Sequence, residues 1–280
     1  MTIGIVTDST CDLPADTAQR LGVAIVPCYI NIGEASYLDG ISLTRQAFYE
    51  NLTVFPKLPK TSAPGIGLFT ETYRRLADEG ISQVISMHIH SGLSNLSNAA
   101  RQAAGMMQGI KVNVIEIGQL ALGLGFMVMT AAEAALEGNP EAEIIRRIRK
   151  QEKNTFVYAA LDTLDYLRES GRAPGLLTNI ASLLHIKPII QLHQGRLRLA
   201  GQTRTITTSI DWLISGIQKL GNLGQIAVLH THALEKAELL RSRIREAFPE
   251  FPEIMISEVT PVLGVHIGPG AVGLVCVKSG

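Results

Sequence analysis

Two short runs of hydroxyl side chains have the composition of an anion-binding site. Thr61 and Ser62 stand just before Ala63-Pro64-Gly65, and Ser91 and Ser94 lie between a predicted strand and a predicted helix. Hydroxyl groups and the unpaired amides at the start of a helix can together hold a carboxylate. The same residue types at the same spacing also form ordinary helix caps, so spacing alone leaves both interpretations open.

A third candidate is the glycine-rich segment from Gly264 to Gly270, which contains His266. Glycines permit a tight, exposed backbone that a ligand can approach closely. The imidazole of His266 can donate a hydrogen bond to an anion. A lone histidine is usually structural, so the surrounding glycines carry most of this prediction.

Two His-x-His sequences favour a different chemistry. His88 and His90, and likewise His230 and His232, stand at the ends of apolar strands, where alternate side chains share a face. Two such pairs could bind zinc and activate water for hydrolysis. No H-E-x-x-H or other complete ligand set accompanies them, so a metal-dependent hydrolase is the alternative hypothesis and not the leading one.

The sequence lacks the common motifs for nucleotide binding and for serine hydrolysis. It contains no G-x-x-x-x-G-K-[ST] loop, no strand-linked G-x-G-x-x-G and no G-x-S-x-G elbow. The 25 basic and 25 acidic residues cancel, so nucleic acid is not an expected partner. The three cysteines are far apart and indicate neither a disulfide framework nor a zinc knuckle.

The most apolar stretch, Leu120 to Leu136, is interrupted by glycines and by Glu133. It is too short to cross about 30 Å of hydrocarbon as a helix, so we expect a buried helix and not an integral membrane protein. The first residues show no basic segment followed by an apolar run, which predicts a cytoplasmic protein.

The first half of the chain alternates short β-branched runs with longer stretches of helical period. This is the pattern of βαβ units and predicts an α/β domain with a mainly parallel sheet and helices on both faces. The predicted strands are Ile3 to Thr7, Val23 to Ile30, Gln83 to Ile89 and Val112 to Ile117.

The second half changes character after a charged helix at about Glu141 to Lys153. Two apolar runs, Ile186 to Leu192 and Arg196 to Leu199, flank Gln194-Gly195 and predict an antiparallel hairpin. We therefore expect two domains, residues 1–153 and residues 154–280, the second with a mixed sheet and helices.

Six motifs, in the same order and spacing, resemble the bacterial DegV family, and the resemblance covers essentially the whole chain. They are Ile5 to Leu13, Thr61-Ser62-Ala63-Pro64, Ser91-Gly92-Leu93-Ser94, Gly171-Arg172, Ile186-Lys187-Pro188 and His266 to Gly270. The resemblance implies two α/β domains that enclose a fatty acid, with its carboxylate near the domain junction and its tail among apolar side chains.

By the matching motifs, the resemblance assigns carboxylate contacts to Thr61, Ser91 and His266, with Ser62 and Ser94 beside them. The hydroxyl loops belong to the first domain, and the second contributes His266 and the apolar tail pocket. The expected ligand is a long-chain fatty acid such as palmitate, stearate or oleate. The resemblance implies no catalytic residue and no cofactor.

The resemblance also implies a partner. In bacterial fatty acid kinase, an ATP-binding subunit phosphorylates the acid that a DegV-like subunit presents, and the product is an acyl phosphate. Arg172 and Arg204 match positions where a cation could meet that partner or the phosphate. Arg172 could equally form a surface ion pair.

The sequence departs from the family pattern in one loop. His90 stands where the family usually has serine, and Asn95-Leu96 replaces a Gly-Thr pair. Since Ser91 and Ser94 remain, these differences bear on chain-length preference and on the choice of partner more than on carboxylate binding.

Overall fold

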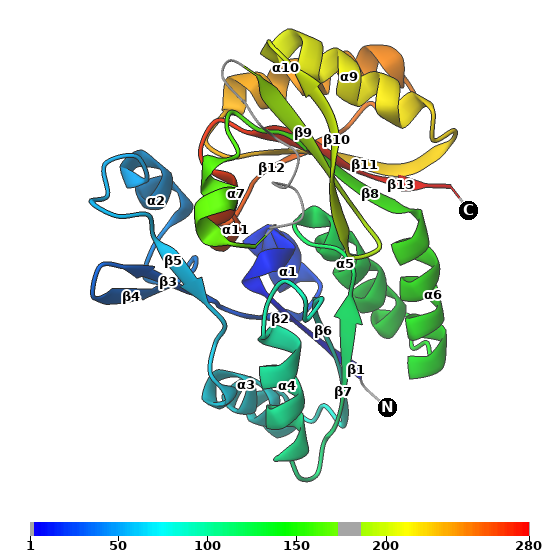
Figure 1. Cartoon of the computed structure of the whole chain (residues 1–280). Coiled ribbons are helices and arrows are strands. Elements are labelled where there is room, and N and C mark those ends of the chain that lie inside the picture. Colours follow the sequence, from blue (N-terminus) through cyan, green and yellow to red (C-terminus); the bar gives the residue numbers. More distant parts are fainter. Residues whose placement is uncertain (1–2, 173–185, 280) are drawn as a thin grey trace.

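The chain folds as two α/β layers stacked on each other, with a small third sheet at one side (Figure 1). The computed structural model describes residues 3–172 and 186–279. Among these residues the strands form a four-stranded parallel sheet, a six-stranded mixed sheet and a three-stranded antiparallel sheet. The predicted fold class, two α/β domains with a parallel and a mixed sheet, is confirmed.

The parallel sheet has the strand order β2-β1-β6-β7. Its two central strands are almost wholly buried, as expected for β-branched runs that helices cover on both faces. The strands are β1 (Ile3–Asp8), β2 (Val23–Val26), β6 (Gln83–Ile89) and β7 (Lys111–Ile117).

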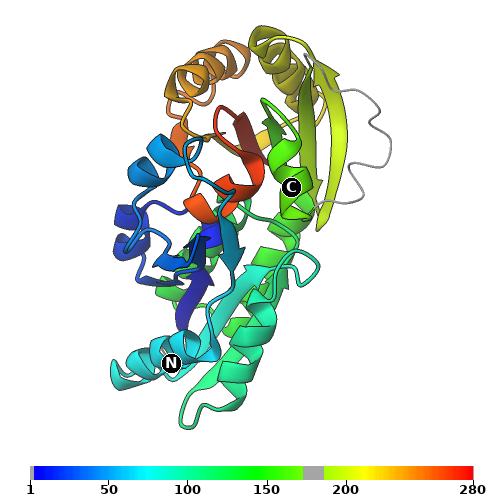
Figure 2. The same ribbon diagram turned by 60° about the vertical axis from the view of Figure 1, so that its left-hand side comes forward.

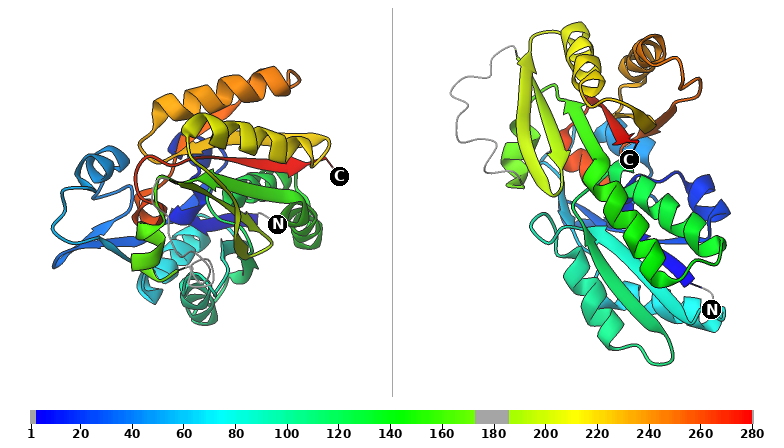
Figure 3. Two further views of the ribbon diagram at one scale, coloured as in Figure 1. Left: turned by 45° about the horizontal axis from the view of Figure 1, so that its top comes forward. Right: turned by 90° about the vertical axis from the view of Figure 1, so that its right-hand side faces the viewer.

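Helices cover both faces of this sheet. Helices α3 and α4 pack together on one side, and α5 and α6 pack together on the other (Figure 3). Helix α5 also contacts β8 (Thr155–Ala160) and β13 (Val272–Lys278) of the mixed sheet, which explains why it is apolar almost all round. No helix among the described residues is long and apolar enough to cross a membrane. The bounds are α1 (Ala15–Arg20), α3 (Ile66–Asp78), α4 (Leu96–Gly105), α5 (Leu122–Leu136) and α6 (Glu141–Asn154).

The small antiparallel sheet was not predicted. We expected one strand from Val23 to Ile30, but β2 ends at Val26 and a new strand begins at Tyr29 in a different sheet. Pro27 lies at the break, where its missing amide cannot continue a ladder. The sheet consists of β3 (Tyr29–Ile32), β4 (Ala35–Leu38) and β5 (Lys60–Ser62), and α2 (Arg45–Asn51) lies in the connection between β4 and β5.

The mixed sheet has the order β10-β9-β8-β13-β11-β12, and only its β11–β12 pair is parallel. The predicted hairpin is confirmed: Gln194 and Gly195 join β9 and β10, with φ angles of 48° and 74° as in a type I′ turn. The strands are β8 (Thr155–Ala160), β9 (Lys187–His193), β10 (Arg196–Thr203), β11 (Leu223–His230), β12 (Met255–Glu258) and β13 (Val272–Lys278).

Side chains alternate along each strand, so the mixed sheet has two apolar faces. One face packs against helices, and the other packs against the first layer. Tyr158 and Val228 belong to the core under α9 (Ile206–Gln218) and α10 (Leu234–Ala247), which cover the outer face in Figure 2. Val157, Leu192 and Leu229 point the other way, into a core shared with the parallel sheet. The inner face of this sheet therefore meets the first layer. The predicted boundary at residues 153 and 154 stays a prediction and falls where α6 passes into β8.

A short helix near the C-terminus, α11 (Pro261–Ile267), is anchored to the first layer. The amide and hydroxyl of Thr260 both donate to Asp12 Oδ1, at 2.9 and 2.7 Å, directly after the 3₁₀ turn η1 (Ser9–Cys11). Tyr49 in α2 donates to the carbonyl of Val259 at 2.9 Å. Helix α7 (Asp165–Ser170) packs against α11 as well. These contacts fix the helix that carries His266.

The close packing of α2 on α11 depends on Gly264. A methyl group there would overlap the hydroxyl of Tyr49, which is itself buried. We expect Gly264→Ala to lower the free energy of unfolding by about 1–3 kcal/mol, the usual cost of overpacking. Urea denaturation followed by circular dichroism measures this change.

The matched control is Gly67→Ala in α3, where an added methyl group meets no atom within 4 Å. That variant should be as stable as the parent or more stable by up to about 1 kcal/mol. Equal stability of the two variants would contradict the packing that we describe.

Candidate functional site

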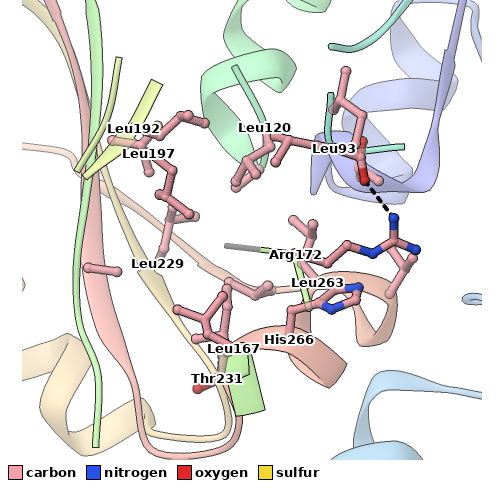
Figure 4. A pocket seen from close by; sticks show the side chains of 18 of the residues that line it. Leu93, Leu120, Leu167, Arg172, Leu192, Leu197, Leu229, Thr231, Leu263 and His266 are labelled. Atoms are coloured by element: carbon pink, nitrogen blue, oxygen red, sulfur yellow. Dashed lines mark hydrogen bonds between the residues drawn. The ribbon is translucent and has the colours of Figure 1, made fainter. Parts of the chain in front are cut away.

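An apolar pocket lies between the two layers, and both contribute to its walls (Figure 4). It encloses about 1120 Å³ of space, a volume that includes its opening to solvent. The lining side chains are predominantly aliphatic. They include Ile89, Leu93, Leu96, Leu120, Val157, Leu167, Ile190, Leu192, Leu197, Leu229, Val259, Val262, Leu263 and Ile267.

All four parallel strands end at this pocket. Thr10 follows β1, Cys28 follows β2, Ile89 closes β6 and Leu120 follows β7, and each of them lines the wall. Ligands of open parallel sheets bind at the carboxyl ends of the strands. Thr10 and Cys28 were not predicted as site residues, although their positions after strands of a parallel sheet indicate them.

One side of the pocket is polar. Thr61 from β5, His266 from α11 and Arg172 just after α7 meet there, and Ser94 from the loop before α4 also lines the pocket. Ser62 lines the pocket as well, but its hydroxyl accepts from Asn31 Nδ2 at 3.3 Å. The Thr61 hydroxyl lies 3.0 Å from His266 Nε2, although the two residues are 205 positions apart in the chain. Figure 4 shows Arg172 and His266 on the same side of the pocket.

His266 is neutral at physiological pH. Burial and, as the smaller cause, the positive charge of Arg172 together lower the pKa of its imidazole from 6.5 to about 4. Its Nδ1 atom is buried and has no hydrogen-bond partner among the described residues. A buried polar atom without a partner is unfavourable, so this nitrogen is the atom of the site with the clearest need for a ligand.

Arg172 supplies the only positive charge among the residues that line the described pocket. Its side chain is exposed, and one guanidinium nitrogen donates to the carbonyl of Leu93 at 3.0 Å. This bond crosses between the two halves of the chain and closes part of the pocket rim. No ion pair to Arg172 is formed within residues 3–172 and 186–279, so the structure does not bear out the surface ion pair that we also considered.

The helix-cap interpretation of the hydroxyl runs is wrong. Thr61 and Ser62 are part of strand β5, and α3 begins only at Ile66, with Gly65 as its N-cap. Helix α4 begins after Asn95 without any side-chain cap. The small sheet, unexpected from the sequence, is what turns Thr61 toward His266.

Ser91 and Arg204 do not join the polar side of the pocket. The amide and hydroxyl of Ser91 both donate to Glu116 Oε2, at 3.2 and 3.1 Å. Burial acts to raise the pKa of Glu116, but hydrogen bonds from Arg101, Ser91 and Ser97 outweigh it and bring the pKa to about 2. Glu116 is therefore a firmly charged acceptor that occupies Ser91. Arg204 is exposed just past β10 and does not line the pocket.

The first His-x-His pair is split between two environments. His88 is fully buried, with Nδ1 2.7 Å from Asp8 and Nε2 2.7 Å from Ser86. His90 is exposed because β6 ends at Ile89, so the alternation that would align the two rings has stopped. Both nitrogens of His88 already have protein partners.

The second pair stays together, because the Nδ1 atoms of His230 and His232 lie 3.9 and 3.7 Å from the same oxygen, Glu258 Oε1. His230 Nδ1 accepts from the amide of Ala233 at 3.2 Å, while the ring of His232 stacks on Tyr49 at 5.9 Å. Within the described ranges no three histidine, cysteine, aspartate or glutamate side chains are grouped to hold a metal ion. The hypothesis of a metal-dependent hydrolase is not supported.

The charge of Arg172 can be tested through the titration of His266. Since a nearby cation disfavours the imidazolium, Arg172→Gln should raise the pKa of His266 above about 4. The value should stay below 6.5, because burial is the larger cause of the shift. Two-dimensional NMR of the histidine rings in ligand-free protein measures both values.

Arg204→Gln provides the control, because that guanidinium is exposed and outside the pocket. It should leave the titration of His266 unchanged. A His266 that titrates near its ordinary value in the parent protein would contradict the buried environment that we describe.

Comparison with known proteins agrees with this architecture. A sequence model described as an uncharacterised protein of the DegV family matches residues 2–279. A DegV domain-containing protein of Streptomyces coelicolor is 35% identical over 275 residues, which cover 98% of this chain and 97% of that protein.

Two solved structures extend the match to three dimensions. A DegV family protein from Thermus thermophilus, described for its fatty acid binding, is 29% identical with a TM-score of 0.92 and 100% coverage of both chains. DegV from Bacillus subtilis, a fatty acid binding protein, is 29% identical with a TM-score of 0.90 and covers 99% of this chain and 100% of its own. The chain thus belongs to the DegV family.

Proposed function

We propose that this protein binds a long-chain fatty acid, such as palmitate, stearate or oleate, and presents it unchanged to a partner. The observation that carries the proposal is the pocket itself, aliphatic over most of its wall and polar at the Thr61–His266 pair. A fatty acid has the same division between an apolar chain and one polar end. Fatty acid binding by the relatives from Thermus thermophilus and Bacillus subtilis supports this choice of ligand.

The head of the ligand meets neutral donors. Because the ring of His266 is neutral, the Thr61–His266 pair has one hydroxyl proton and one ring proton. One proton is used between the two residues, and the other is free for a carboxylate. Ser94, which also lines the pocket, can donate a further hydrogen bond. Each hydrogen bond to a charged group contributes about 1.5–3 kcal/mol.

The tail provides most of the affinity. Transfer of each methylene from water into the aliphatic part of the pocket is worth about 0.8 kcal/mol, so a chain of more than ten methylenes outweighs the head. The hydrogen bonds at the polar side then fix the direction of the chain. Orientation matters because the carboxylate has to face the rim where Arg172 lies.

The partner that we propose is the ATP-binding subunit of a fatty acid kinase. A carboxylate oxygen would attack the terminal phosphorus of ATP, and cleavage of the bond to ADP would leave an acyl phosphate. Arg172, exposed at the rim and the one cation of the described pocket wall, has the right charge to meet the transferred phosphoryl group. The carrier itself supplies position and no chemical step.

The carboxylate contacts can be tested with two serines from one loop. Ser94 lines the pocket, whereas the hydroxyl of Ser91 is held by Glu116, so the proposed contact is Ser94 and not Ser91. Thr61→Val and Ser94→Ala should each weaken palmitate binding about 10- to 100-fold, as the loss of a charge-assisted hydrogen bond would. Ser91→Ala should leave the affinity unchanged.

Isothermal titration of delipidated protein with palmitate measures the three affinities, and circular dichroism checks that each variant is folded. The proposal fails if the parent protein does not bind palmitate. The assignment of the head site fails if Thr61→Val and Ser94→Ala bind as tightly as the parent.

The role of Arg172 can be separated from ligand binding. With the ATP-binding subunit of a bacterial fatty acid kinase, Arg172→Gln should form palmitoyl phosphate at least about tenfold more slowly, because one charge contact to phosphate is lost. Its palmitate affinity should change much less, since the guanidinium is exposed. Arg168→Gln, on the surface of α7 and paired with Asp165, is the matched control and should behave as the parent. Equal rates in all three proteins would refute the role of Arg172.

A further inference from the structure

The two layers also meet at a backbone contact beside the pocket. Gly118, just after β7, accepts a hydrogen bond from the amide of Gly195 at 2.7 Å. Its own amide donates to Glu152 Oε1 in α6 at 2.6 Å. The backbone of Gly118 is thus held from the β9–β10 turn and from α6. We call Gly118, Glu152, Gln194 and Gly195 together the Gly118 clamp.

Only glycine fits at the centre of this clamp. A Cβ atom on residue 118 would lie 2.5 Å from the amide nitrogen of Gly195 and 2.8 Å from the carbonyl carbon of Gln194. Both are backbone atoms of a tight turn, so no side-chain rotation can relieve the overlap. Any larger residue would push the hairpin tip away from the first layer.

The clamp is surrounded by pocket-lining residues. Leu120 is two positions after Gly118, and Leu192 and Leu197 are cross-strand partners one pair before the turn. Ile89 precedes His90, whose ring lies close to Gly195. Three chain segments that form the pocket wall therefore converge on one contact.

The clamp stands away from the polar side of the pocket. Figure 4 shows Leu192 and Leu197 at the opposite side from Arg172 and His266, with Leu120 between them. A chain whose carboxylate lies at His266 would run toward Leu192 and Leu197. Its terminal methyl group would stop where the hairpin tip meets Gly118.

We propose that the Gly118 clamp closes the tail end of the pocket and limits the length of the acyl chain that the protein accepts. This inference rests on the proposed binding of a fatty acid. Each added methylene increases the affinity as long as it contacts the aliphatic wall of the pocket. A methylene beyond that wall must separate Gly195 from Gly118. Selection for length is thus made by a backbone contact between the layers.

The test is a plot of log affinity against chain length for saturated acids of 10 to about 22 carbons. For the parent we expect a rise of about fourfold per methylene and then a break, after which longer acids bind no more tightly. Leu197→Ala should move the break to chains longer by about two carbons, because it removes three carbons from the end wall. Leu197→Phe should move the break to shorter chains.

Leu167→Ala is the matched control, because Figure 4 places Leu167 beside His266. This substitution should weaken the binding of all acids by a similar factor and leave the break at the same chain length. An unchanged break in both Leu197 variants, or a break that moves as far in Leu167→Ala, would overturn the inference.

The clamp itself is tested with Gly118→Ala, which should blur or abolish the break and speed palmitate release at least about tenfold. Gly105→Ala, where an added methyl group meets no atom within 4 Å, is its control. If Gly118→Ala does not fold, the two Leu197 variants decide the question. Absence of any fatty acid binding by the parent would instead defeat the proposed function, whereas binding with an unmoved break defeats only the role of the clamp.

Discussion

The burial of apolar strand faces between the two sheets is the interaction on which the rest of this structure depends. The inner face of the mixed sheet, with Val157 and Leu229, belongs to the same core as Ile85 of the parallel sheet, and α5 packs against both. This core is continuous except at the pocket, where the same alternation of side chains lines an open space. A fatty acid tail in the pocket would fill this gap in the core and contact both layers. Binding of the ligand would therefore stabilise the association of the two layers.

The polar side of the pocket follows a different rule, because a buried carboxylate is costly unless donors surround it. A buried cation would balance the charge but would be equally costly in the ligand-free protein. The site instead uses a neutral histidine and hydroxyl groups, and it leaves its one charge, Arg172, exposed at the rim. Residues outside the pocket position His266. Asp12 accepts hydrogen bonds from Thr260 at the start of α11, and α11 places His266 beside Thr61. Burial raises the pKa of Asp12 to about 6, although Arg45 and the bonds from Thr260 act to lower it, so burial disfavours the charged form of this anchor.

Local patterns in the sequence predicted most of the elements, because strand alternation, helical period and the Gln194-Gly195 turn act within a few residues. They did not predict the small sheet, since its three strands are short and the residues that pair β5 with β3 are 29 to 33 positions apart. For the same reason the sequence could not show whether Thr61 caps a helix or faces His266. The resemblance to the family indicated segments that line the pocket, but only the partner of each hydroxyl separates Ser94 from Ser91. That partner, Glu116, lies on another strand 25 residues away.

The most direct measurement is a crystal structure of the protein bound to palmitate. We expect density for one extended chain in the pocket, with its carboxylate within hydrogen-bond distance of Thr61 or His266. The terminal methyl group should lie against Leu192 and Leu197. A chain in the reverse direction, with its carboxylate beside the hairpin tip, or palmitate bound outside the pocket would contradict it.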